Sequence, residues 1–151
     1  MAVSNVGDVL DRVQELERRQ IEMYAVIRDS ATDDGVRLLT HYLARHKRHL
    51  PEAFSCFSPD QMKQIRRTPV LEEDVAIDAD HYFKGKTISA DIKADTLLDC
   101  AIEYIQKLLD CFHHMSHQSL GEETLTLFDS LYKIEVKDIV ELKKIKAMHY
   151  F

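Results

Sequence analysis

Six polar side chains interrupt the apolar stripes of three predicted helices, and five of them are of types that bind metal ions. They stand in pairs three positions apart: Glu17 with Gln20, His46 with His49, and Glu135 with Asp138. Residues three apart are neighbours on one helix face, so both members of a pair can reach the same place. Carboxylates and imidazoles are common ligands of iron, manganese and zinc. The pattern therefore predicts a metal site formed by Glu17, His46, His49, Glu135 and Asp138.

Four amphipathic helices are expected to position these side chains. The sequence predicts them from about residues 4–8 to 30, from 32–35 to 54, from 95 to 116, and from 123 to 148. Residues 55–94 lack a sustained helical period and are expected to form a long crossover with a short helix at 60–66. The predicted fold is therefore all-α: an antiparallel four-helix bundle of two helical hairpins joined by that crossover.

The apolar stripes of the two hairpins share one register. Residues 10–27 of the first helix repeat the pattern of residues 98–115 in the third, so that Leu10 corresponds to Leu98 and Glu17 to Ile105. The second helix matches the fourth in the same way, with Leu39 corresponding to Phe128. This common register indicates an internal duplication of one hairpin. It also predicts that the polar pairs, each midway along its helix, meet at one level of the bundle.

The composition sets the class of protein. The chain has 151 residues, of which 45% are hydrophobic and 30% charged, with four Gly and three Pro. We expect one globular, helix-rich domain over residues 1–151, because this length buries a sizeable core and the turn residues that many strands need are scarce.

The charge and the absent motifs exclude several function classes. The formal net charge of −6 argues against a partner nucleic-acid duplex, which calls for a broad basic face. No segment reaches the length of a membrane span, and the N-terminus lacks the pattern of a secretory signal. Cys56, Cys100 and Cys111 form no Cys-x-x-Cys pair and are expected as free thiols in a reducing compartment. The sequence thus predicts a cytoplasmic protein without a membrane or nucleic-acid partner.

The first two predicted helices carry a family resemblance. The run Val13-Gln14-Glu15-Leu16-Glu17, followed by Tyr24, resembles the first helix of rubrerythrin-like members of the ferritin-like superfamily. In that family a ligand Glu is followed seven residues later by Tyr. Residues 39–49 are similar to the second helix of the family, which carries Glu-x-x-His, and the long crossover is similar to the ferritin-like connection. The resemblance implies a ferritin-like bundle that binds iron.

The ligand set implied by the resemblance is only partly present. Glu17, His49 and Glu135 match ligand positions of the family, whereas His46 stands in place of a Glu and Asp138 in place of a His. Ile105 stands where the third helix of the family supplies a Glu. The family comparison therefore implies an altered site, either mononuclear or an incomplete dimetal centre, and argues against conventional ferroxidase or peroxidase chemistry.

Two alternatives remain open from the sequence. In the first, the polar residues form a metal-free hydrogen-bond network with protonated histidine, and the bundle is a non-catalytic homodimer or partner-binding protein. In the second, the second helix is rotated, so that Leu43 and Leu50 face inward and the histidines lie near the boundary. Because one interpretation is a non-catalytic bundle and the other a metal site, the sequence predicts no particular enzyme activity.

His113 and His117 form a further pair near the end of the third predicted helix. Their spacing of four places both imidazoles on one side, which suits zinc if other ligands come from elsewhere. The simpler interpretation is that protonated histidines complement the negative end of the helix dipole.

Overall fold

The computed structural model describes residues 5–45, 49–70, 77–86, 89–118 and 120–149. This part of the chain is mostly helical and holds no strand, only an isolated bridge between Asn5 and Pro69. Its helices are α1 (Val6–Ser30), α2 (Asp34–Arg45), α3 (His49–Phe54), α4 (Pro59–Arg67), α5 (Ala79–Phe83), α6 (Ala94–Ser116) and α7 (Glu122–Met148). The all-α prediction is therefore confirmed.

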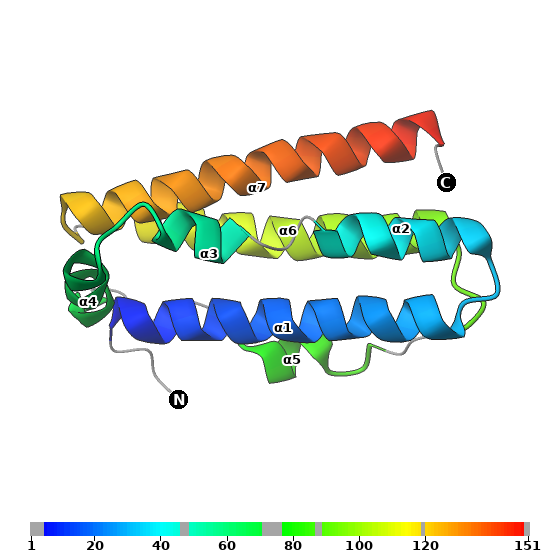
Figure 1. Ribbon diagram of the computed structural model, residues 1–151, viewed down its shortest axis with the longest axis horizontal. Helices are drawn as coiled ribbons and strands as arrows, with labels where there is room; N and C mark the ends of the chain where they lie inside the picture. The colour runs from blue at the N-terminus through cyan, green and yellow to red at the C-terminus, as the bar shows by residue number, and fades with distance from the viewer. Residues whose placement is uncertain (1–4, 46–48, 71–76, 87–88, 119, 150–151) are drawn as a thin grey trace.

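The longer helices lie lengthwise against one another (Figure 1). Helix α6 packs along α7, α2 packs against both α1 and α6, and α3 packs against α7. Helices α1 and α7 run in one direction along the molecule, whereas α2, α3 and α6 run in the other (Figure 1). Helix α4 lies across one end, against α1 and α7, and α5 lies against α1. The chain between α3 and α6 thus returns from one end of the molecule to the other.

Local capping chemistry sets where two of the helices begin. The side chain of Asn5 accepts a hydrogen bond from the backbone N–H of Asp8 at 2.9 Å, and Asp8 accepts one in return from the backbone N–H of Asn5. Ser58 and Gln61 form the same reciprocal box at the start of α4, where Pro59 occupies the first helical position. Such boxes satisfy backbone donors that have no partner inside the helix.

Most predicted helix boundaries agree with the structure within two residues. Helices α1, α6 and α7 match three of the predicted long helices, and α4 matches the short helix expected in the crossover. The second predicted helix is described as two pieces, α2 and α3, and residues 46–48 between them lie outside the described residues. Pro51 lies within α3, so this proline does not end the helix. Helix α5 was not predicted.

The predicted stripes of α1, α6 and α7 form the interior. Every member of these three stripes is buried, from Leu10 and Leu98 to the polar Glu17 and Glu135. In α2 and α3, Leu39, Leu43 and Leu50 are buried and Tyr42 is half-buried. Leu43 and Leu50 therefore face inward, as the rotated alternative for the second predicted helix expects.

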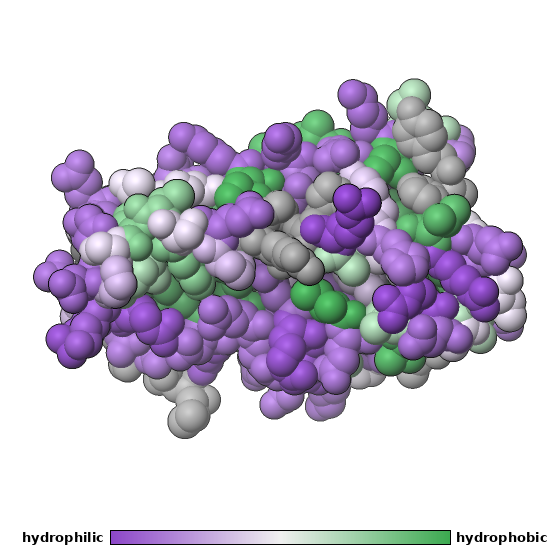
Figure 2. All heavy atoms as spheres, in the orientation of Figure 1, coloured by the Kyte–Doolittle hydropathy of each residue, from purple (hydrophilic) through white to green (hydrophobic). Residues whose placement is uncertain are grey.

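The buried apolar side chains form two clusters along the length of the molecule. One gathers the first half of α1, the end of α6, the start of α7, and residues of α3 and α4. The other gathers the second half of α1, the start of α6, the end of α7, and α2. On the outside, Figure 2 shows mostly hydrophilic side chains on this face, with hydrophobic ones in separate patches. Among the described helices, none combines the length and apolarity needed to cross a membrane.

We expect Phe128→Ala to lower the free energy of unfolding by about 3–5 kcal/mol, because it removes a fully buried ring from the core. The Phe128 ring packs against Phe112, with 6.2 Å between centroids. Urea unfolding followed by circular dichroism measures the change. The matched control on the same helix is Val140→Ala, at a side chain that is 59% exposed, where we expect a change within about 0.5 kcal/mol. Equal losses in the two variants would contradict this assignment of the core.

Candidate functional site

A layer of buried polar side chains lies between the two apolar clusters. Glu17 and Gln20 contribute to it from α1, and Glu135 and Asp138 from α7. Their exposed fractions are 6%, 1%, 2% and 9%, respectively. Ionised carboxylates seldom reach such burial without a cation or hydrogen-bond donors beside them. This layer is therefore the place in the fold where polar chemistry is concentrated.

Tyr104 of α6 brings the two glutamates to one point of the layer. Its ring is fully buried, and burial together with the nearby carboxylates of Glu17 and Glu135 holds the pKa of its phenol well above the usual value. Both carboxylates act on the same hydroxyl, so both lie near it. Glu17 of α1 and Glu135 of α7 thus both act on the phenol of Tyr104.

Tyr24 and Gln20 extend the layer along α1. Gln20 donates a hydrogen bond from Nε2 to the Tyr24 hydroxyl at 2.8 Å, and both side chains are buried. Burial is the main cause that raises the pKa of Tyr24, and Tyr82, Cys100 and Glu135 add to it. Within the described part of the chain, Gln20 Oε1 is buried without a hydrogen-bond partner. Tyr24 thus orients the amide of Gln20 through its Nε2, and the Oε1 of the same amide remains a hydrogen-bond acceptor.

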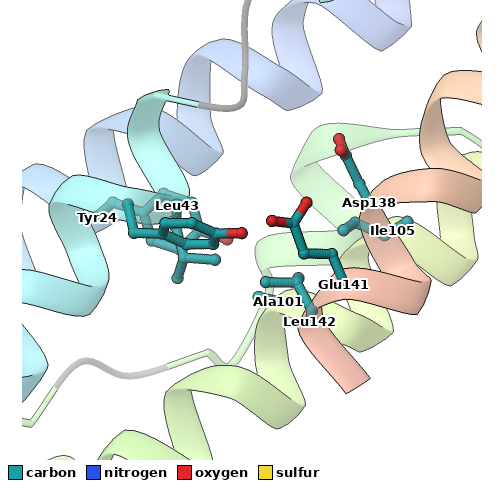
Figure 3. A pocket seen from close by; sticks show the side chains of 8 residues that line it. Tyr24, Leu43, Ala101, Ile105, Asp138, Glu141 and Leu142 are labelled. Carbon is teal, nitrogen blue, oxygen red and sulfur yellow. The ribbon is translucent and has the colours of Figure 1, made fainter. Parts of the chain in front are cut away.

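Asp138 belongs to a different corner of the layer. Together with Tyr42 and Glu141 it lines a cavity of about 10 Å³, roughly the space of one water molecule. Burial, a hydrogen bond to Glu141 and the charge of Asp138 raise the pKa of Tyr42. In Figure 3 the carboxylates of Asp138 and Glu141 leave α7 in different directions. The other lining residues are Tyr24, Leu43, Ala101, Ile105 and Leu142.

The structure gives different outcomes for the five predicted ligands. Glu17 and Glu135 are buried near Tyr104, and Asp138 is buried near Tyr42. His46 lies outside the described residues, and of His49 only the backbone, which begins α3, is described. Among the residues that can be examined, no three His, Cys, Asp or Glu side chains are grouped closely enough to hold a metal ion. The site with both histidines therefore stays a prediction.

Helix α6 faces the layer with apolar residues except at Tyr104. Ile105 and Leu108, the counterparts of Glu17 and Gln20, are both buried, so α6 supplies no carboxylate at this level of its stripe. Tyr104 and Glu141 are the residues that the stripe analysis missed. Tyr104 lies next to Ile105 in sequence and four residues before Leu108. A helix that buries a face wider than a three-four stripe would therefore bury Tyr104 as well. Glu141 lies next to Leu142 at the exposed edge of α7, where no sequence signal distinguishes it.

The comparisons with known proteins find no counterpart for this site. No protein-family model, no curated protein and no solved structure matches the chain. The assignment of the polar layer therefore depends on the side chains of this chain and their surroundings.

The raised pKa of Tyr104 has a consequence for stability at alkaline pH. A phenol has an ordinary pKa of about 10, so above that pH the unfolded chain releases a proton that the folded chain retains. The contribution of the raised Tyr104 pKa to the free energy of unfolding is complete below about pH 10. Above that pH it is lost, at up to about 1.4 kcal/mol per pH unit. We expect Tyr104→Phe to make this decline shallower.

Urea unfolding at several values between pH 9 and 11.5 measures the two slopes. Because the slopes are compared, a change in overall stability caused by the substitution does not affect the result. Tyr132→Phe, at a half-buried tyrosine between the two apolar clusters, is the matched control. Identical slopes for the wild type and Tyr104→Phe would show that the hydroxyl is not held in its neutral form by this layer.

Proposed function

We propose that the protein is a ferritin-like four-helix bundle whose central polar layer binds one transition-metal ion. The directions of the helices support the bundle: α1 and α7 run one way, and α2, α3 and α6 run the other (Figure 1). An up-down-down-up order needs a connection as long as the bundle between its second and third members. The chain from α3 to α6, which includes α4 and α5, has that length.

The burial of two glutamates whose charges act on the same tyrosine is the observation that supports the metal proposal. Glu17 and Glu135 are 6% and 2% exposed, and their carboxylates act on the same Tyr104 hydroxyl. Two carboxylates sharing a desolvated site repel one another, and each loses its hydration. A divalent cation between them would offset both costs and would lower the pKa of each carboxyl.

The sequence offers further candidate donors besides this pair. His46 and His49 are the imidazole donors that the sequence predicts for the second helix, and imidazole suits iron, manganese and zinc. Asp138 lies one turn after Glu135 on α7 and would serve as an additional carboxylate. Because α6 contributes Ile105 at the corresponding position, the set fits one ion or an incomplete pair better than a full dimetal centre. Such an ion would supply Lewis-acid or redox chemistry.

A metal-free bundle that binds a protein partner or a second copy is the competing function. It is favoured by one observation: the described Glu17, Glu135 and Asp138 do not form a metal-holding group by themselves. In that case the carboxylates would be protonated or bonded to donors such as phenols and imidazoles. The two functions differ in what a chelator does, because removing a structural ion lowers stability and an apo protein is unaffected.

We expect untagged protein from metal-replete cells to carry about one equivalent of iron, manganese or zinc. The double variant Glu17→Gln with Glu135→Gln is expected to lose most of it, because amides keep the shape of the side chains but remove both negative charges. Elemental analysis by mass spectrometry measures the content. The matched control is Glu22→Gln, an exposed glutamate on the same helix, which we expect to retain the metal.

Thermal unfolding with and without a chelator provides the second measurement. Metal binding at the layer predicts a lower Tm for the wild type in chelator, and the same Tm for the double variant in both conditions. A metal-free wild type with an unchanged Tm would sink the metal proposal and favour the partner-binding bundle.

A further inference from the structure

A pair of exposed histidines occupies the last turns of α6, away from the polar layer. His113 and His117 are both exposed, and their ring centroids are 4.2 Å apart with 46° between the ring planes. His113 follows Tyr104 by nine residues, which places it about 13 Å further along the helix axis at 1.5 Å per residue. The pair is therefore a separate feature from the buried carboxylates.

The hydrogen bonds of His117 fix which of its nitrogens is free. Its Nδ1 lies 2.8 Å from the backbone carbonyl oxygen of His113. A carbonyl oxygen only accepts, so Nδ1 carries the proton and donates it. In the neutral ring this leaves the lone pair on Nε2. A histidine that binds a metal commonly donates its other ring N–H to a backbone carbonyl in this way, which orients the ring and makes it a better ligand.

The surroundings keep both rings in place and leave them accessible. The His113 ring lies 5.9 Å from the ring of Tyr132 on α7, at 41° between the planes, so the neighbouring helix borders the pair on one side. Ser116 donates to the same carbonyl of His113 at 2.8 Å and thereby holds the last turn closed. Both histidines are exposed, so water can complete the coordination shell of an ion bound to them.

We propose that His113 and His117 form a surface site for a borderline divalent metal ion such as Ni²⁺, Cu²⁺ or Zn²⁺. Two imidazoles four residues apart on one helix face reach neighbouring positions of a single ion, and water fills the remaining positions. Magnesium and calcium, which prefer oxygen ligands, are excluded by this donor set. No third His, Cys, Asp or Glu joins the pair among the described residues, so the site is open and exchangeable.

Metal titration of untagged protein tests the proposal. The exposed Cys56 is replaced by Ser in every sample, because an accessible thiol would also bind these ions. We expect Ni²⁺ to bind more tightly than Co²⁺, and Co²⁺ more tightly than Mn²⁺, as imidazole ligands dictate. His113→Asn and His117→Asn are each expected to weaken Ni²⁺ binding by at least about tenfold, since each removes one of two protein ligands.

The matched control is His41→Asn, at an isolated exposed histidine on α2, which we expect to leave the affinity unchanged. Histidine ring resonances in a Zn²⁺ titration locate the ion independently of any change in stability. The proposal predicts that the resonances of His113 and His117 shift together. Equal Ni²⁺ affinity in the wild type and in the His113→Asn variant, or Zn²⁺-induced shifts confined to other histidines, would overturn it. Metal bound in the polar layer would persist in all these variants and is thereby distinguished.

Discussion

The fold depends on the burial of charged and polar side chains at one level between two apolar clusters. Glu17 and Glu135 are surrounded by protein yet carry groups that prefer water, so each loses hydration that its surroundings must replace. The apolar clusters on either side supply free energy that offsets the burial of this layer. Everything functional that we infer for the interior follows from how these charges are compensated.

The two apolar clusters stabilise the fold, and the polar layer between them holds the candidate site. Rings such as Phe112 and Phe128 pack one half, while Tyr24 and Leu39 belong to the other. Between them, the hydroxyl of Tyr104 lies near the carboxylates of Glu17 and Glu135, and Gln20 donates a hydrogen bond to the hydroxyl of Tyr24. Side chains held by packing on both sides lose little further freedom when they bind an ion or a proton, which favours a preorganised site.

The helices could be predicted closely because their signals are local. Asn5 caps α1, Ser58 and Pro59 open α4, and the period of Leu98, Ala101 and Ile105 defines α6. Two features could not be predicted in this way. Helix α5 is five residues long, too short for a period to be recognised. Tyr104 entered the site because α6 is buried over a wider face than a three-four stripe describes, and that width depends on the neighbouring helices.

The sequence by itself determined the buried stripes of α1, α6 and α7, because helical period and hydropathy act within one segment. It thereby selected Glu17, Glu135 and Asp138 for burial and Ile105 and Leu108 as their apolar neighbours. Only the tertiary structure decided which buried groups meet. It placed Glu17 and Glu135 where both act on Tyr104, and Glu141 where it bonds Tyr42, since the rotation and offset of packed helices are set by side chains from several segments at once.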